Sequence, residues 1–268
     1  MERVEPSIPL VQVSGVTLRF GGVTALDDVS FDVRQGELFA IIGPNGAGKT
    51  SIFNCLNGVY RPERGSIRLS GNELVGRRPS AIATLGVART FQNVGLFHHL
   101  TVLENLLLGR HCAMRSGFLS GALFWGRARR EEIAHRRACE DIIELLELEP
   151  YRFLTTGRLP YGVLKRVELG RALAMEPKLL LLDEPVAGMN LEETEDMARF
   201  ILEINEELHT STILVEHDMR MVMDIAHRVL ALDFGKVLTI GAPTDVQSHE
   251  SVVSAYLGSL GASAGVSP

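Results

Sequence analysis

The chain begins with two stretches whose hydrophobic pattern is typical of β-strands. Apolar and polar residues alternate loosely from Val11 to Phe20, and Val29 to Val33 forms a second apolar stretch. The turn residues Gly21-Gly22 lie between them, so the pattern predicts a β-hairpin. Unbroken apolar runs indicate strands that are buried on both faces, as in a parallel sheet. Further strands are predicted for Leu38–Ile42, Ser66–Leu69, Leu179–Leu182, Thr212–Val215, Val229–Leu232 and Val237–Ile240.

Other segments carry apolar residues at helical spacing. The stretch Arg129–Leu148 combines a polar face with isoleucines and leucines and predicts an amphipathic helix. Helices are also predicted for Ser51–Asn57, Leu100–Gly109, Val167–Met175, Leu191–Leu208 and, as a last turn, Val252–Leu257. The order of these elements predicts an α/β core with an N-terminal antiparallel β subdomain and a helical insertion.

This order also predicts the domain boundaries. A single domain covers residues 10–258, in which 10–87 and 166–258 form the α/β core and about 88–165 form the helical subdomain. Residues 1–9 are expected to be a tail. Residues 259–268, rich in glycine, serine and alanine, are expected to be disordered.

Composition excludes several classes of protein. The 268 residues carry a net charge of −6, which gives no support for nucleic-acid binding, so no nucleic-acid partner is expected. No apolar run approaches the ~20 residues that a membrane-spanning helix needs. The N-terminal residues lack the apolar region of a signal peptide. Cys55, Cys112 and Cys139 are too widely spaced for a disulfide framework or a zinc site, and buried thiols are expected.

A phosphate-binding loop, here called the P-loop, follows the predicted strand Leu38–Ile42. Residues 43–50 match G-x-x-x-x-G-K-[ST] at every fixed position, and a helix is predicted to follow. The loop amides and the helix N-terminus then face an anion, Lys49 reaches the β- and γ-phosphates, and the Thr50 hydroxyl binds Mg²⁺. The residues predicted to bind nucleotide here are Gly43, Pro44, Asn45, Gly46, Ala47, Gly48, Lys49, Thr50 and Ser51.

Two carboxylates end the predicted strand Leu179–Leu182. Asp183 and Glu184 lie at the carboxyl end of a strand, where open α/β sheets place their ligands. Asp183 is predicted to hold Mg²⁺, and Glu184 to orient the attacking water or accept its proton. ATP and Mg²⁺ are the cofactors that this pair of motifs implies.

From about Leu10 to Gly258, the chain resembles the ATPase subunits of ABC transporters. The resemblance implies that Phe20 stacks on adenine and that Gln92, in R-T-F-Q-N, contacts Mg²⁺ and senses the membrane partner. It implies that His217, in V-E-H-D, contacts the γ-phosphate. Catalytic roles are thus expected for Glu184, His217 and Lys49. Gly188, Met189 and Asn190 occupy the family's D-loop, where Asn190 replaces an aspartate.

The family signature, L-S-G-G-Q or L-S-Y-G-Q, is altered in this chain. Leu159, Tyr161 and Gly162 fit, whereas Pro160 replaces the serine and Val163 the glutamine. The family pattern implies that this segment reaches the γ-phosphate bound by the opposite subunit of a dimer. Proline is expected at the first helical position, which tolerates it, but it offers no N–H to an anion. The site at the partner's P-loop is therefore expected to be weakened, unless the Gly162 amide and the helix dipole suffice.

Within the family, the chain resembles the ATP-binding subunits of branched-chain amino-acid importers. The segments that indicate this include F-G-G-V-T-A-L at 20–26, F-H-H-L-T-V-L-E-N at 97–105 and E-H-D-M at 216–219. The resemblance implies a second ATPase subunit, with a heterodimer favoured over a homodimer, integral membrane permeases and, indirectly, an external substrate-binding protein. It places the chain at the cytoplasmic face of the cell membrane. Urea and amide importers, lipopolysaccharide export and non-transport ABC ATPases are the alternatives.

The segment Ser116–Trp125 combines aromatic residues with glycines, and arginines follow it. It is expected to pack on its own domain, and contact with a membrane or a membrane partner is the alternative.

Overall fold

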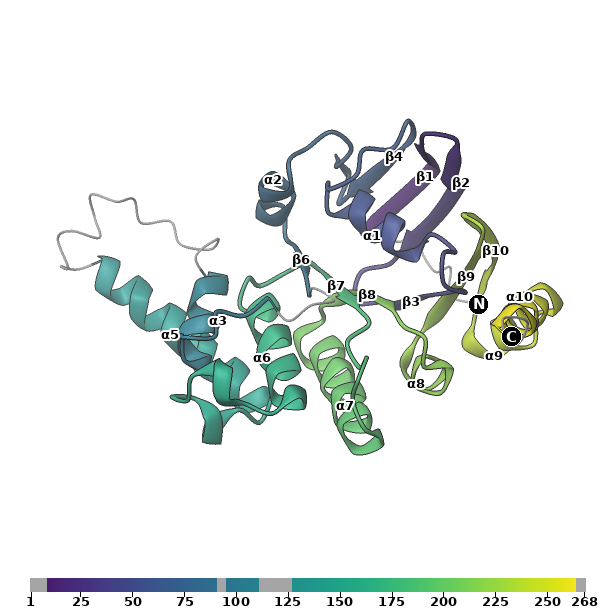
Figure 1. Cartoon of the computed structure of the whole chain (residues 1–268). Helices are drawn as coiled ribbons and strands as arrows, with labels where there is room; N and C mark the ends of the chain where they lie inside the picture. Colours follow the sequence, from purple (N-terminus) through teal and green to yellow (C-terminus); the bar gives the residue numbers. More distant parts are fainter. Residues whose placement is uncertain (1–8, 91–94, 111–126, 264–268) are drawn as a thin grey trace, which may run out of the picture.

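The computed structural model describes residues 9–90, 95–110 and 127–263 and contains two β-sheets (Figure 1). The smaller sheet is antiparallel, in the order β2-β1-β4-β5. Its strands are β1 (Val11–Phe20), β2 (Val23–Val33), β4 (Arg64–Leu69) and β5 (Asn72–Glu73). Strand β2 begins earlier than predicted and pairs with β1 as far as the Phe20–Val23 turn. The predicted antiparallel β subdomain is confirmed.

The larger sheet has six strands, in the order β10-β9-β3-β8-β7-β6. Neighbours from β9 to β6 are parallel, and β10 pairs antiparallel with β9. The strands are β3 (Leu38–Ile42), β6 (Val87–Arg89), β7 (Leu179–Asp183), β8 (Ser211–Val215), β9 (Arg228–Asp233) and β10 (Lys236–Gly241). The carboxyl ends of β3, β6, β7 and β8 therefore lie at one edge of this sheet.

Side chains of the central strands are buried on both faces of the sheet. Along β3, Leu38, Ala40 and Ile42 belong to one hydrophobic cluster, whereas Phe39 and Ile41 belong to another. The first cluster includes helices of the helical subdomain, and the second includes the antiparallel sheet. The unbroken apolar run at Leu38–Ile42 is the sequence pattern that such two-sided burial requires.

Helices surround the larger sheet, and one group of them extends away from it (Figure 1). This group contains α3 (Val102–Arg110), α5 (Arg127–Leu145) and α6 (Tyr161–Leu173). Among the described residues, no helix is both long and apolar enough to cross a membrane. The remaining helices are α1 (Lys49–Leu56), α2 (Pro79–Thr84), α7 (Leu191–Leu208), α8 (Met219–Ile225), α9 (Pro243–Gln247) and α10 (Glu250–Ser263).

Several element bounds differ from those expected from sequence. Helix α5 ends at Leu145 rather than Leu148, and Glu147 then adopts a positive φ of 51°. Helix α6 runs from Tyr161 to Leu173, so it begins earlier and ends earlier than the predicted helix Val167–Met175. Helix α10 continues to Ser263, into the tail expected to be disordered; its leucine and alanine residues favour helix.

Candidate nucleotide-binding site

The P-loop joins β3 to α1, as the sequence predicts. A side chain at Gly43 would clash with the backbone oxygen of Leu232, and a Cβ at Gly48 would lie 2.7 Å from the Ala25 oxygen. Gly46 faces open space but has a φ of +82°, which L-residues rarely adopt. Gly48 is the N-cap of α1, so the first amides of that helix face the same side as the loop.

Lys49 is buried beneath the loop. Its Nζ donates hydrogen bonds to the carbonyl oxygens of Gly43 at 2.6 Å and Pro44 at 2.9 Å. Burial lowers the pKa of Lys49, and the negative charges of Glu184 and Asp183 act in the opposite direction. The lysine is thus held at the loop, and both carboxylates of the neighbouring strand act on its charge. The Thr50 side chain is exposed one residue further along.

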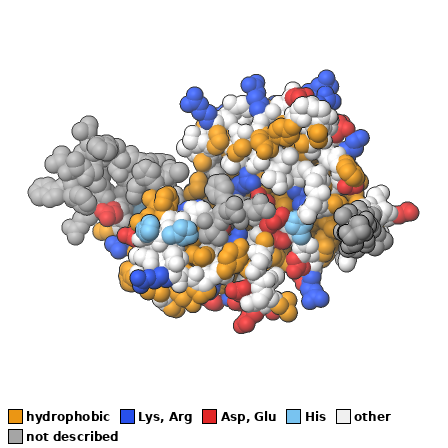
Figure 2. All heavy atoms as spheres, viewed as in Figure 1, with side chains coloured by type: hydrophobic (Ala, Val, Ile, Leu, Met, Phe, Trp, Pro, Cys, Tyr) orange, Lys and Arg blue, Asp and Glu red, His pale blue; other side chains and the backbone are white. Residues whose placement is uncertain are grey.

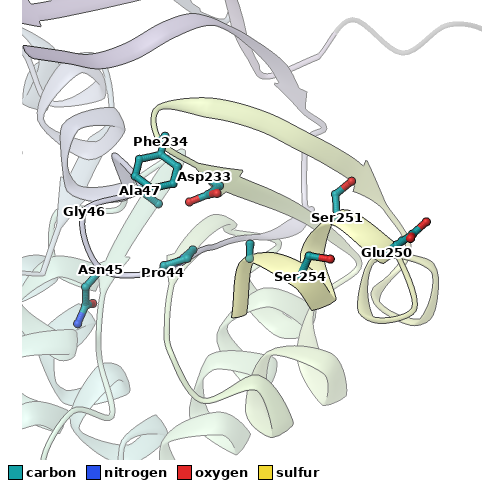
Figure 3. Close-up of a pocket in the computed structure, with 10 residues that line it drawn as sticks. Pro44, Asn45, Gly46, Ala47, Asp233, Phe234, Glu250, Ser251 and Ser254 are labelled. Carbon is teal, nitrogen blue, oxygen red and sulfur yellow. The ribbon is translucent and has the colours of Figure 1, made fainter. Parts of the chain in front are cut away.

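A cavity of about 770 Å³ lies beside the P-loop, between the loop and helix α10 (Figure 3). Figure 3 shows Pro44, Asn45, Gly46 and Ala47 along one wall. Asp233 ends β9 and Phe234 lies in the β9–β10 turn, whereas Glu250, Ser251 and Ser254 come from α10. The outer side of the loop is therefore accessible, and C-terminal residues form the opposite wall.

Asp183, at the end of β7, forms a buried ion pair. Its Oδ2 lies 2.6 Å from a guanidinium nitrogen of Arg89, and the two side chains are 3% and 10% exposed. Arg89 also donates a hydrogen bond to Asn54 Oδ1 at 2.7 Å and lies over the ring of Phe53. Arg89 therefore joins β6, the P-loop helix α1 and the carboxylate of Asp183.

Glu184 and His217 meet across the ends of β7 and β8. His217 Nε2 lies 2.8 Å from Glu184 Oε1. Glu184 has a φ of 49°, in the left-handed region, and its N–H donates to the Val215 oxygen at 2.8 Å. Such a conformation in a residue other than glycine persists only where neighbouring contacts hold it. The structure thus brings together Lys49, Asp183, Glu184 and His217, four of the residues predicted from sequence.

Phe20 and Gln92 are two further residues that the resemblance places at the nucleotide site. Phe20 ends β1, is 48% exposed and packs edge-on against Tyr60 at a centroid distance of 5.0 Å. Its ring is thus available for stacking. Gln92 lies outside the described residues.

The signature and D-loop residues form a second group. Pro160 is the N-cap of α6 with a ψ of 156°, so it precedes the helix and does not occupy the first helical position as predicted. Its carbonyl accepts from the Leu164 N–H at 3.0 Å. The Tyr161 hydroxyl donates to the Ala187 oxygen at 3.0 Å, which ties the signature to the residue that precedes the D-loop of the same chain.

Neighbouring residues of this group have structural roles. Leu159 and Val163 are buried in the hydrophobic cluster that the helical subdomain shares with one face of the larger sheet, and Tyr161 lies exposed at the start of α6. Gly188 has a φ of +81°, and Met189 packs against the same cluster. Asn190 is the N-cap of α7 and forms a capping box with Glu193. The residue that replaces the family's aspartate thus stabilises a helix start.

Comparison with known proteins identifies a family and several relatives. Residues 26–187 match the family model described as ABC transporter. The chain is 40% identical over 252 residues to BraF of Pseudomonas aeruginosa, a high-affinity branched-chain amino acid transport ATP-binding protein, covering 94% of this chain and 99% of BraF. It is 38% identical, with the same coverage, to LivG of Escherichia coli, which has the same description.

A solved structure extends the likeness to three dimensions. The ADP conformation of MJ1267, an ATP-binding cassette of an ABC transporter, superposes with a TM-score of 0.81 at 29% identity, covering 94% of this chain and 99% of that one. Fold and site define a P-loop ATPase with a helical subdomain. The chain belongs to the ABC transporter family, as an ATP-hydrolysing, nucleotide-binding subunit.

Two residues at the site were not predicted from sequence. Arg89 lies in a strand of three residues, too short to show a period, and the sequence does not indicate that its partner is Asp183. Glu216 stands in a run of polar residues that resembles a solvated turn, yet it is 3% exposed. A charged residue directly after the buried apolar strand Ser211–Val215 is the signal that could have identified Glu216, whereas no comparable signal marks Arg89.

Proposed function

We propose that Mg-ATP binds at the P-loop and is hydrolysed with Glu184 as the residue that activates water. The observation that carries this proposal is the convergence of Glu184 and His217, 2.8 Å apart, beside buried Lys49. Lys49 turns from the loop carbonyls to the β- and γ-phosphates. His217 holds the Glu184 carboxylate on one side and contacts the γ-phosphate on the other. The ring of Phe20 stacks on adenine.

The residues present fit a bound Mg²⁺. Thr50, which is exposed and directly follows the loop, and Asp183, at the end of β7, both offer hard oxygen donors. Among the described residues, no cluster of three or more His, Cys, Asp or Glu residues can hold a metal alone. Mg²⁺ is usually held by one or two protein oxygens together with phosphates and water. Gln92 is proposed as a further ligand. When bound, the ion neutralises charge on the phosphates.

The test of this site is ATP hydrolysis by the assembled transporter. Glu184→Gln keeps the size of the side chain but removes the base, so we expect hydrolysis to fall by at least about 10²-fold. Mg-ATP binding is expected to stay close to that of the wild type, because Lys49 and the loop amides are unchanged. A Glu184→Gln complex with the wild-type turnover number would contradict the assignment.

We further propose that the chain powers import of branched-chain amino acids from the cytoplasmic face of the cell membrane. The near-complete coverage of BraF and LivG supports this assignment. In this proposal, integral membrane permeases bind the helical subdomain, and an external binding protein supplies the solute. Exposed Phe97, Phe153 and Leu154 lie on that subdomain near His98 and His99. Figure 2 shows histidine and hydrophobic side chains gathered on this part of the surface.

Copurification from membranes tests the transport assignment. We expect an affinity-tagged chain to recover an integral membrane permease and a second ATPase subunit. Disruption of the gene is expected to lower uptake of radiolabelled leucine, isoleucine or valine. Recovery of the chain only from the soluble fraction, with unchanged uptake, would contradict it.

The second ATPase subunit is proposed to be a different chain. A heterodimer would use this chain's P-loop in one site and its altered signature in the other, where Pro160 lacks the N–H and hydroxyl of serine. Restoring both residues, as Pro160→Ser with Val163→Gln, is expected to raise ATP hydrolysis of the complex. Val163 is buried, so Pro160→Ser alone serves as the control for a packing defect. Unchanged hydrolysis in both variants would contradict the weakened-site proposal.

A further inference from the structure

A buried carboxylate joins the two loops that carry Glu184 and His217. Glu216, at the end of β8, is 3% exposed. Its Oε1 accepts a hydrogen bond from the Val186 N–H at 3.0 Å. Its Oε2 accepts a hydrogen bond from the His217 N–H at 2.9 Å and a longer one from the Asp218 N–H at 3.5 Å. One side chain therefore holds backbone from the loop after β7 and from the loop after β8.

Each of these backbone contacts is adjacent to a group proposed to act on ATP. Val186 follows Glu184 by two residues, and the other loop contact is the amide of His217 itself. Glu184 is held in its left-handed conformation from one side by the Val215 oxygen. The hydrogen bond from Val186 to Glu216 holds the following turn from the other side. The separation between the Glu184 carboxylate and the His217 ring thus depends on a backbone that Glu216 fixes.

The chemistry of a carboxylate suits this task. Its two oxygens accept from two separate loops at once, whereas an amide offers one acceptor and places an N–H against the other loop. An apolar residue would leave buried backbone amides unpaired. Burial raises the pKa of Glu216, and hydrogen bonds from the amides of Val186, His217 and Asp218 oppose this. The cost of burying the acid is thus offset by contacts that all lie beside the site.

We propose that Glu216 is a positioning residue for ATP hydrolysis, which sets the 2.8 Å contact between His217 and Glu184. The proposal rests on the function proposed above for those two residues. Glu216 does not touch the nucleotide. It acts through His217, and its loss therefore lowers the turnover number without weakening Mg-ATP binding.

The test uses Glu216→Gln in the assembled transporter. We expect the turnover number to fall by about tenfold or more, while the KM for ATP and the Kd for Mg-ATP stay within about twofold of wild type. Thr212→Val is the matched control: Thr212 is also buried on β8, and its hydroxyl bonds to the Thr210 oxygen at the far end of the strand. This control is expected to leave the turnover number unchanged.

A double-mutant cycle separates positioning from general destabilisation. In a His217→Ala background, the residual hydrolysis is followed over hours, and adding Glu216→Gln is expected to change it by less than about twofold. If the turnover number of the double variant fell by the product of the losses in the two single variants, the proposal would be overturned, because Glu216 would then act independently of His217. A wild-type turnover number in Glu216→Gln, or a parallel loss of Mg-ATP binding, would also overturn it.

A second variant, Glu216→Asp, tests the proposal if Glu216→Gln does not fold. Glu216→Asp keeps both oxygens but withdraws them by one methylene, and the same non-multiplicative cycle with His217→Ala is expected. Failure of the proposed function gives a different result. In that case Glu184→Gln itself retains hydrolysis, whereas failure of the positioning proposal alone leaves Glu184→Gln inactive and Glu216→Gln active.

Discussion

At the scale of single residues, the site depends on buried charges that are paired or hydrogen-bonded. Lys49 lies between loop carbonyls and two carboxylates, Asp183 pairs with Arg89, and Glu216 accepts from backbone amides. Burying a charge without such partners costs several kcal/mol, so each partner holds its charge at a defined position. The loop lysine and Asp183 could be predicted from sequence, because motif spacing places them. The pairing of Asp183 with Arg89 could not be predicted, because the two residues are far apart in the chain.

Removal of Arg89 tests this pairing. Arg89→Met leaves the Asp183 carboxylate buried without its counter-charge, so we expect the free energy of unfolding to fall by about 3–5 kcal/mol without Mg²⁺. The control is Arg68→Met, which breaks the ion pair between Arg68 and Glu73. The side chains of these two residues are 54% and 40% exposed. That change is expected to cost about 1 kcal/mol or less. Equal losses in urea denaturation would contradict the assigned burial.

Buried thiols give a second prediction at this scale. Burial raises the pKa of Cys55 to about 12 and that of Cys139 to about 11. Because the thiolate is the reactive form and its fraction falls tenfold for each pH unit below the pKa, both thiols are expected to be nearly inert at pH 8. In a Cys112→Ser background, a thiol reagent should react with neither until urea unfolds the chain. Rapid labelling of the native protein would contradict this.

At the scale of elements, a strand or helix could be predicted from its hydrophobic pattern where its side chains are buried on one face or on all faces. The strand at Leu38–Ile42 and the helix at Leu191–Leu208 have the bounds that their patterns predict. Strand β6 has too few residues to form an apolar run and was not predicted. The short helices α2, α8 and α9 were not predicted either, because about two turns or fewer do not define a helical period. Their positions follow from tertiary contacts: β6 is a strand because it pairs with β7.

Helix α5 allows a matched test of its buried face. Ile143 is fully buried and Ile133 is 59% exposed on the same helix. Ile143→Ala removes packed methyl groups and leaves a cavity, so we expect the free energy of unfolding to fall by about 2–5 kcal/mol. Ile133→Ala is expected to change it by about 0.5 kcal/mol or less, since exposed positions contribute little. A larger effect at Ile133 than at Ile143 in urea denaturation would show that α5 presents its other face to the core.

At the scale of the whole molecule, the topology of the larger sheet collects the site. The P-loop follows β3, Arg89 and Asp183 end β6 and β7, and Glu184 and His217 lie just beyond β7 and β8. The carboxyl ends of these four strands share one edge. Sequence motifs could therefore predict the nucleotide edge once parallel strands were inferred. The helical subdomain and the signature form a second part of the molecule, and the hydrogen bond from the Tyr161 hydroxyl to the Ala187 oxygen ties the signature to the loop that follows β7.

Calorimetric titration of the folded chain with Mg-ATP tests the central claim most directly. We predict saturable binding by the wild type, and loss of most of that binding in Lys49→Ala, because the charge held under the P-loop is removed. Glu184→Gln is the control and is predicted to bind Mg-ATP as the wild type does. Absence of binding by folded wild-type protein, or equal binding by Lys49→Ala, would contradict the account.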